Sequence, residues 1–211
     1  MRPALEDACR RGIDQGRLLV VAGAGYGKST LLAQVVGGLA MDWAWCSCDR
    51  RTASPAALVA HLSAAIEERV PGFGAELRPV GGAEEVTAAF CNELDLTVSD
   101  DLLLVLDDIH LLQGTSAEVI PGLLIDDLPP VVRLVLSGRS TPLLAAGRLS
   151  PSAVLIDDAD LALAPEEAEA LLQGAGLSAP PGAMRALHAS TEGWAAGLLI
   201  AAQARAQAPP G

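Results

Sequence analysis

The single lysine of the chain is the sequence feature that most constrains its fold. Lys28 stands in the segment Val20-Val21-Ala22-Gly23-Ala24-Gly25-Tyr26-Gly27-Lys28-Ser29-Thr30, and every other basic residue among the fourteen is arginine. The apolar run ahead of the glycines predicts a strand, and the apolar residues after Lys28 predict a helix. A strand, a glycine-rich turn, Gly-Lys-Ser and a helix together form the Walker A arrangement.

The residue types in this segment suit a nest for phosphate. Gly23, Gly25 and Gly27 let the backbone turn so that successive N–H groups point at one anion. The helix that follows directs its positive end at the same place, and a compact ammonium fits between phosphates better than a planar guanidinium. The predicted nucleotide-binding residues of this loop are Gly23, Ala24, Gly25, Tyr26, Gly27, Lys28, Ser29 and Thr30.

One position departs from the strict form of the motif. The pattern G-x-x-x-x-G-K-[ST] asks for glycine where this chain has Ala22. The departure concerns the first bend of the loop and leaves the Gly27-Lys28-Ser29 core intact. A glycine-rich turn that binds nothing is the structural alternative.

A second element carries two carboxylates. Residues 102–106 form an apolar run that ends in Asp107 and Asp108, and the carboxyl ends of strands in open α/β sheets are where ligands bind. We expect Ser29 and Asp107 to hold Mg²⁺, and Asp108 to orient or deprotonate an attacking water. The alternative is an acidic turn after a strand.

A cation and a histidine extend this set. Arg139 also follows a buried strand, so it should reach the same edge and could contact a γ-phosphate; a surface arginine at a turn is the alternative. His110 could contact the phosphates or orient Asp108, although local packing is the favoured interpretation. The candidate catalytic residues are therefore Lys28, Asp108 and Arg139.

Composition narrows the class of protein. The net charge of −12 argues against direct nucleic-acid binding by this chain. No apolar run approaches ~18 residues, which predicts no membrane span, and residues 1–17 do not form a signal peptide, so we expect a cytoplasmic protein. The four cysteines show no metal-ligand spacing and are interpreted as buried small apolar residues: Cys9, Cys46, Cys48 and Cys91.

Strands that alternate with helices predict an α/β fold, a P-loop NTPase with a five-stranded parallel sheet covered by helices on both faces. The expected strands are 17–22, 42–48, 102–106, 131–136 and 153–156. A capping box at Thr115–Glu118 predicts a helix that runs to Leu124. The expected domains are a nucleotide-binding domain at 1–157, a helical subdomain at 158–205 with helices over 165–173, 181–190 and 192–205, and a linker or truncated tail at 206–211.

In this order, the motifs resemble the ATPase domain of the STAND class of signal-transducing NTPases, in particular the large ATP-binding LuxR-type regulators related to the maltose-regulon activator. Besides the loop, the resemblance rests on Arg2-Pro3-Ala4-Leu5, Trp45-Cys46-Ser47-Cys48-Asp49, Leu106-Asp107-Asp108-Ile109-His110, Leu136-Ser137-Gly138-Arg139, Leu163-Ala164-Pro165-Glu166-Glu167-Ala168 and Thr191-Glu192-Gly193-Trp194-Ala195-Ala196-Gly197-Leu198. It implies that Arg2 lies near the adenine. It also implies that the Arg139 strand lies between the Lys28 and Asp107 strands.

The resemblance implies a switch, in which ADP holds the regulator closed, ATP opens it for self-association, and slow hydrolysis resets it. Such regulators continue into a winged-helix subdomain, a sensor region and commonly a DNA-binding module, whereas this chain stops at Gly211. We therefore expect either an excised domain or an unusually short protein. Its partners would be ATP or ADP with Mg²⁺, and a second copy or further domains of a larger regulator.

Two other functions stay open. One is a non-catalytic scaffold that binds nucleotide to hold its shape and presents a surface to protein partners. The other, less favoured, is a small-molecule kinase. Such kinases place several arginines in a mobile lid, whereas only Arg148 and Arg185 lie between Arg139 and Arg205 among the basic residues.

Overall fold

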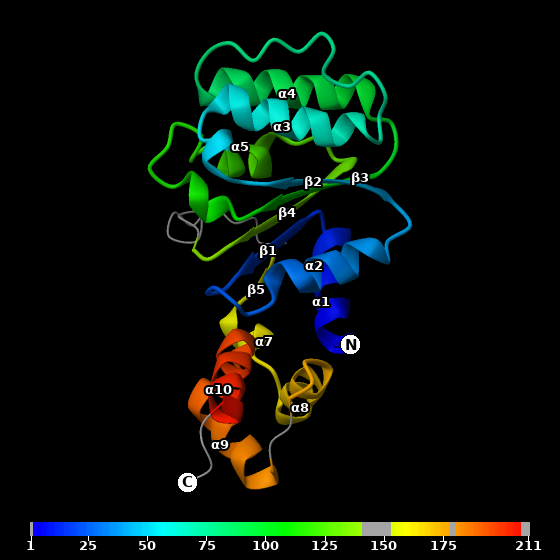
Figure 1. Cartoon of the computed structure of the whole chain (residues 1–211). Coiled ribbons are helices and arrows are strands. Elements are labelled where there is room, and N and C mark those ends of the chain that lie inside the picture. Colours follow the sequence, from blue (N-terminus) through cyan, green and yellow to red (C-terminus); the bar gives the residue numbers. More distant parts are fainter. Residues whose placement is uncertain (1, 141–152, 178–179, 208–211) are drawn as a thin grey trace. The chain divides into compact units, whose positions relative to one another are not determined.

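A computed structural model describes residues 2–140, 153–177 and 180–207. Arg148 and the tail after residue 207 lie outside the described residues. The chain divides into two compact units, one made of Met1–Val21 and Ser29–Ile156, the other of Ala22–Lys28 and Asp157–Gly211. The glycine-rich loop therefore belongs to the same unit as the C-terminal helices. Figure 1 shows the course of the chain.

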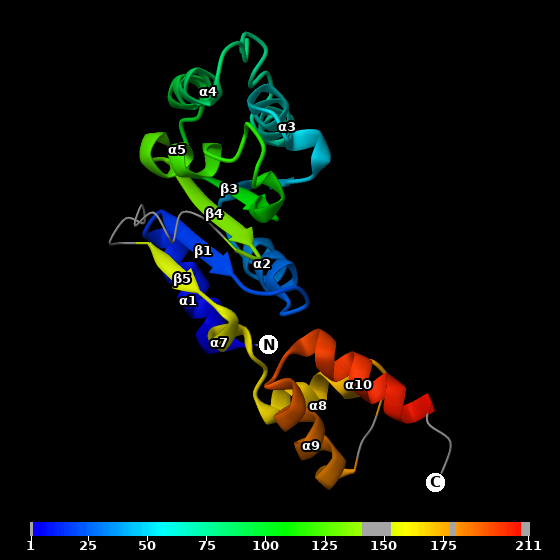
Figure 2. The same cartoon turned by 90° about the vertical axis from the view of Figure 1, so that its left-hand side faces the viewer.

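The first unit is built on a five-stranded parallel sheet, as the sequence predicts. Its strands are β1 (Arg17–Val21), β2 (Asp42–Ser47), β3 (Leu102–Asp107), β4 (Val132–Gly138) and β5 (Val154–Ile156). Their order is β2-β3-β4-β1-β5, with β1 between β4 and β5 in Figure 2. Strand β4, which precedes Arg139, thus lies between β1, which precedes the loop, and β3, which ends in Asp107. This confirms the expected order.

Helices cover both faces of this sheet. They are α1 (Pro3–Asp14), α2 (Lys28–Gly37), α3 (Pro55–Glu67), α4 (Ala83–Thr97) and α5 (Ile120–Asp127), with short 3₁₀ turns η1 (Arg50–Thr52) and η2 (Ile109–Leu112). Helices α3, α4 and α5 lie together on one face, while α1 and α2 lie on the other (Figure 1). Because both faces are covered, every residue of β3 is buried.

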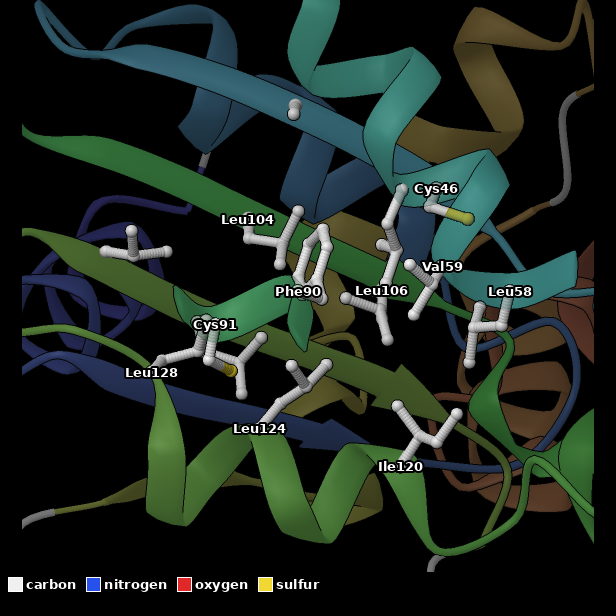
Figure 3. Close-up of a cluster of buried hydrophobic side chains, with 14 of the residues drawn as sticks. Cys46, Leu58, Val59, Phe90, Cys91, Leu104, Leu106, Ile120, Leu124 and Leu128 are labelled. Atoms are coloured by element: carbon white, nitrogen blue, oxygen red, sulfur yellow. The ribbon is translucent and has the colours of Figure 1, made fainter. Parts of the chain in front are cut away.

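The larger core lies between the sheet and helices α3, α4 and α5. Figure 3 shows Leu104 and Leu106 of β3 beside Phe90 of α4 and Leu124 of α5. Cys46 and Cys91 lie in the same cluster. All four cysteines are buried, which confirms their interpretation as small apolar residues.

The helix predicted to start at Thr115 is a correction. The α-helix begins only at Ile120 and runs to Asp127, whereas Thr115 and Glu118 form a turn: the Thr115 hydroxyl accepts from the Ala117 amide at 3.2 Å, and the Glu118 carboxylate accepts from the Gly114 amide at 2.8 Å. Pro121 explains the late start. It has no N–H to donate to the carbonyl four residues earlier, so it is tolerated only in the first turn of a helix.

The helices of the second unit are α7 (Asp158–Leu161), α8 (Pro165–Gly174), α9 (Pro181–Thr191) and α10 (Ala195–Gln207). Helices α8, α9 and α10 enclose a small apolar core of their own, formed by Ala168, Leu172, Leu187, Leu198 and Ala202. The last helix begins at Ala195 rather than at the predicted Glu192 because Glu192 and Gly193 have positive φ angles of 49° and 77°. Gly193 is required there, since a Cβ atom would lie 2.6 Å from the carbonyl oxygen of Leu163.

None of the helices in the described part of the chain combines the length and apolar character needed to cross a bilayer.

Candidate functional site

Two of the three glycines of the loop have a left-handed backbone, whereas Gly23 does not. Gly25 and Gly27 have φ angles of 78° and 86°, in the left-handed region that glycine adopts without strain. Of the described non-glycine residues, only Asp108 and Glu192 have positive φ. Ala22 is therefore not in a conformation that requires glycine, and it is 1% exposed. The departure from the strict motif leaves the loop's fold unaffected.

Lys28 is a nearly buried cation at the start of α2. The residue is 8% exposed, and its Nζ donates to the carbonyl oxygens of Ala22 at 2.8 Å and Gly23 at 2.9 Å. A desolvated ammonium at a helix N-terminus favours an anion nearby, because both the charge and the helix dipole attract it. The loop therefore presents backbone N–H groups and a positive charge together.

Ser29, the next residue, is hydrogen-bonded to the tip of β3. Its hydroxyl donates to Asp107 Oδ2 at 2.7 Å. Asp107 is 4% exposed, and its Oδ1 accepts from the Asp108 amide at 2.9 Å. A hydroxyl beside a carboxylate is the oxygen pair expected for Mg²⁺. The described residues contain no group of three His, Cys, Asp or Glu that could hold a metal, so phosphate and water oxygens would complete the shell, as is usual for Mg²⁺.

Asp108 has a strained backbone and a partly exposed carboxylate. Its φ and ψ are 58° and 33°, which a non-glycine residue adopts at some cost in free energy. His110 Nδ1 lies 3.7 Å from Asp108 Oδ1, and the two side chains are 13% and 43% exposed. The histidine is thus largely buried and packed locally, as favoured, while its role in orienting Asp108 stays a prediction.

Arg139 lies in the exposed turn directly after β4, beside the segment that carries Asp108. A Cβ atom at Gly138 would lie 3.0 Å from Ile109 Cγ1 and 3.3 Å from the His110 amide nitrogen. Gln113 Nε2 donates to Ser140 Oγ at 3.0 Å. The ends of β3 and β4 are therefore tied together, which brings the Arg139 and Asp108 segments side by side.

Ser137 is a polar residue that sequence reasoning did not single out. It is fully buried in β4, and its hydroxyl has no hydrogen-bond partner among the described residues. Leu136 pairs with Leu106 and Ser137 with Val20, so Ser137 stands in the row of the sheet next to Asp107. The only sequence signal was a hydroxyl in an otherwise apolar strand.

Within the second unit, residues of its C-terminal part contact the loop at three consecutive residues. The Gly23 amide donates to Asp158 Oδ1 at 2.8 Å, Trp194 Nε1 donates to the Ala24 carbonyl oxygen at 2.8 Å, and the Ala196 amide donates to the Gly25 carbonyl oxygen at 3.1 Å. Asp158 was not predicted as a site residue. An acidic residue after the last strand gave no signal of its own, since its partner is a backbone amide 135 residues away.

Three further predicted binding residues, Tyr26, Thr30 and Arg2, lie in or near the loop and at the start of the chain. Tyr26 lies over Gly23, whose added Cβ atom would be 3.4 Å from the ring, and Thr30 is exposed in the first turn of α2. Arg2 precedes α1 and donates through its backbone amide to Glu6 Oε1 at 3.2 Å. Its role beside an adenine stays a prediction.

The thiols near the site are in their neutral form at ordinary pH. Burial, followed by the charges of Cys46, Asp107 and Asp108, raises the pKa of Cys48 to about 12. Burial and then the Asp49 carboxylate raise the pKa of Cys46 to about 11. Because a thiolate is the form that binds metals and reacts, neither cysteine is suited to either role.

A parallel sheet with β4 between β1 and β3, a glycine loop that leads into α2, and an acidic tip on β3 define the P-loop NTPase fold. Comparison with solved structures agrees. A STAND protein with a tetratricopeptide repeat sensor from Pyrococcus horikoshii superimposes with a TM-score of 0.52 at 16% identity, over 90% of this chain and 28% of that one. The Aeropyrum pernix ORC1 protein, solved in complex with DNA, gives a TM-score of 0.57 at 15% identity, over 94% of this chain and 57% of that one.

Among curated proteins, the chain is similar to the serine/threonine-protein kinase PknK of Mycobacterium tuberculosis and of Mycobacterium bovis. The identity is 32% over 213 residues, which covers 95% of this chain but 19% of PknK. The chain thus spans about a fifth of the length of the relatives that it matches. No protein-family model matches the chain.

Proposed function

We propose that this chain binds ATP or ADP with Mg²⁺ and acts as a slowly hydrolysing switch domain of a signalling or transcriptional regulator. The observation that carries the proposal is the Ser29–Asp107 hydrogen bond at 2.7 Å, directly after the buried ammonium of Lys28. It supports the assignment because it joins the two halves of a phosphate and metal site that the sequence places 78 residues apart.

Each residue has a defined task in this proposal. The loop amides and Lys28 bind phosphate oxygens, and Ser29 with Asp107 would hold Mg²⁺, which neutralises phosphate charge when bound. Asp108 orients the attacking water or accepts its proton, and Arg139 contacts the terminal phosphate. The strained backbone of Asp108 supports a functional role, since such conformations cluster at active sites.

We take the similarity to PknK as support for a role within a larger regulator, and not for a protein-kinase reaction. Protein kinases use a His-Arg-Asp catalytic loop and a strand lysine, but none of the three histidines here is followed by Arg-Asp, and the single lysine lies in the glycine loop. We therefore assign to this chain the role of a nucleotide-binding segment that can be joined to different partner domains. Self-association in the ATP form belongs to the same proposal.

The test is calorimetric titration with MgATP and MgADP. Lys28→Ala removes a charge-assisted interaction of roughly 1.5–3 kcal/mol, so we expect affinity to fall by about tenfold or more. Arg78→Ala is the matched control, because it removes one positive charge from an exposed loop position. Equal affinity in the wild type and Lys28→Ala would show that the site is wrongly assigned.

A non-catalytic scaffold is the second candidate, favoured by the three hydrogen bonds that hold the loop to Asp158, Trp194 and Ala196 within the second unit. Phosphate release under single-turnover conditions separates the two: release supports the switch, and tight binding without release selects the scaffold. A small-molecule kinase would instead transfer phosphate to a metabolite in a substrate screen.

A further inference from the structure

The loop and the C-terminal helices belong to one compact unit, although more than a hundred residues separate them in the sequence. The hydrogen bonds from Asp158, Trp194 and Ala196 fall on Gly23, Ala24 and Gly25 in turn. Three consecutive residues of a phosphate-binding loop are thus held by side-chain and backbone groups from outside it.

Close packing reinforces these hydrogen bonds. A Cβ atom at Gly25 would overlap the Ala196 side chain and lie 3.0 Å from Trp194 Nε1. A Cβ atom at Gly197 would overlap the Trp194 ring. Glycine is therefore needed at Gly25 for close approach as well as for its positive φ, and the indole lies packed between the loop and the first turn of α10.

The two accepting carbonyls fix the direction of two amides. In a trans peptide unit the C=O and the following N–H point in opposite directions. With the Ala24 carbonyl directed at the indole and the Gly25 carbonyl at the start of α10, the N–H groups of Gly25 and Tyr26 must point away from that helix. The Gly23 amide, in contrast, is taken by Asp158.

We propose that Trp194, with Asp158 and the Ala196 amide, positions the phosphate-binding loop by aiming the Gly25 and Tyr26 N–H groups at the nucleotide phosphates. The inference rests on the proposed function and deepens it. Trp194 is a positioning residue that acts through the loop backbone. By reciprocity, nucleotide in the loop stabilises the start of α10, so that occupancy is transmitted to the helices.

The test uses Trp194→Phe, which keeps an aromatic ring but removes the indole N–H. Nucleotide affinity should fall by about two- to tenfold, the value of one net hydrogen bond expressed in the bound state. Trp45→Phe is the matched control, because Trp45 Nε1 donates to Ser47 Oγ on β2, and its removal should leave affinity unchanged. Affinities are measured well below the melting temperature of every variant, so that a loss of folding stability alone would not change the nucleotide affinity.

Hydrogen exchange supplies the second readout. MgADP should slow exchange at the Ala196 amide in the wild type, and this protection should shrink in Trp194→Phe. Asp158→Ala and Asp158→Asn keep the inference testable if the tryptophan variant does not fold: the alanine should weaken binding, whereas the asparagine retains an acceptor for the Gly23 amide.

The outcomes separate the two proposals. A wild-type chain that binds no nucleotide would overturn the proposed function. If the wild type binds MgADP while Trp194→Phe and Asp158→Ala bind equally well with unchanged protection at Ala196, the proposed function stands and the positioning role is refuted.

Discussion

The hydroxyl of Ser29 donates a hydrogen bond of 2.7 Å to Asp107 Oδ2, linking the first turn of α2 to the last residue of β3. Asp107 is buried, and its other oxygen accepts from the following amide. Both oxygens of the carboxylate are thus oriented by the fold, which is what a metal ligand of fixed geometry requires.

The first prediction concerns the metal. Ser29→Ala and Asp107→Asn should each abolish most of the Mg²⁺ dependence of nucleotide affinity while leaving metal-free binding close to wild type, because the loop amides and Lys28 are unchanged. Titration with ATP in the presence of Mg²⁺ and of EDTA measures this. Ser99→Ala, which removes an exposed hydroxyl that donates to its neighbour Asp100 at 3.4 Å, is the control. A full Mg²⁺ effect in Asp107→Asn would remove this residue from the metal site.

The second prediction separates strain from catalysis at Asp108. Asp108→Gly should raise the free energy of unfolding by about 1 kcal/mol, since glycine adopts positive φ without cost, and should abolish phosphate release. Asp108→Asn should keep wild-type stability and also lose turnover. Glu192→Gly is the matched control, because it relieves a positive φ of 49° in the second unit and should leave turnover intact. Normal phosphate release in Asp108→Asn would show that this carboxylate is not the base.

Much of this site could be predicted from the sequence because its residues lie in contiguous motifs. The strand, loop and helix around Lys28 and the apolar run before Asp107 fix both the fold and the ends of the strands. Asp158 and Ser137 could not be predicted in the same way. Asp158 accepts a hydrogen bond from a backbone amide that is far away in the sequence. Ser137 stands out only in the structure, where its buried hydroxyl has no hydrogen-bond partner among the described residues.

The third prediction tests that hydroxyl. A buried polar group without a partner costs about 1–3 kcal/mol, so Ser137→Ala should not destabilise the nucleotide-free protein and is expected to raise its unfolding free energy. If the Ser137 hydroxyl also contributes to the reaction at the site, the turnover of Ser137→Ala should fall as well. Thr87→Val removes another buried hydroxyl without a partner among the described residues, in α4, and should stabilise without any loss of turnover. A destabilised Ser137→Ala would show that the hydroxyl is satisfied in solution.

The fourth prediction concerns alkaline stability. Burial first, then nearby charges, raises the pKa of Cys48 from 9.0 to about 12. Because the folded-state pKa is raised, this contribution to stability is complete below pH 9.0 and is lost as the pH rises toward about 12. The loss should approach about 1.4 kcal/mol per pH unit for one such thiol. Urea unfolding of wild type and Cys48→Ala at pH 8 to about 11 isolates the effect, and parallel curves would contradict it.

The starts of two helices, one in each unit, show a different limit of sequence reasoning. The helices that begin at Ile120 and Ala195 were each predicted to start several residues too early. The capping pattern at Thr115 indicates that a helix follows but not how long the preceding turn is. Before the second start, only glycine fits at position 193, because its backbone lies directly against that of Leu163. Contacts of this kind depend on the tertiary structure and leave no local pattern.

The central claim is that the loop from Gly23 to Thr30 receives nucleotide phosphates beside a metal held by Ser29 and Asp107. A crystal structure grown with excess Mg²⁺ and a non-hydrolysable ATP analogue tests it most directly. The account predicts phosphate oxygens against the Gly25–Ser29 amides and Lys28, with Mg²⁺ bound by the Ser29 hydroxyl and next to Asp107. A saturated crystal whose loop holds no phosphate, or whose metal lies away from both residues, would contradict it.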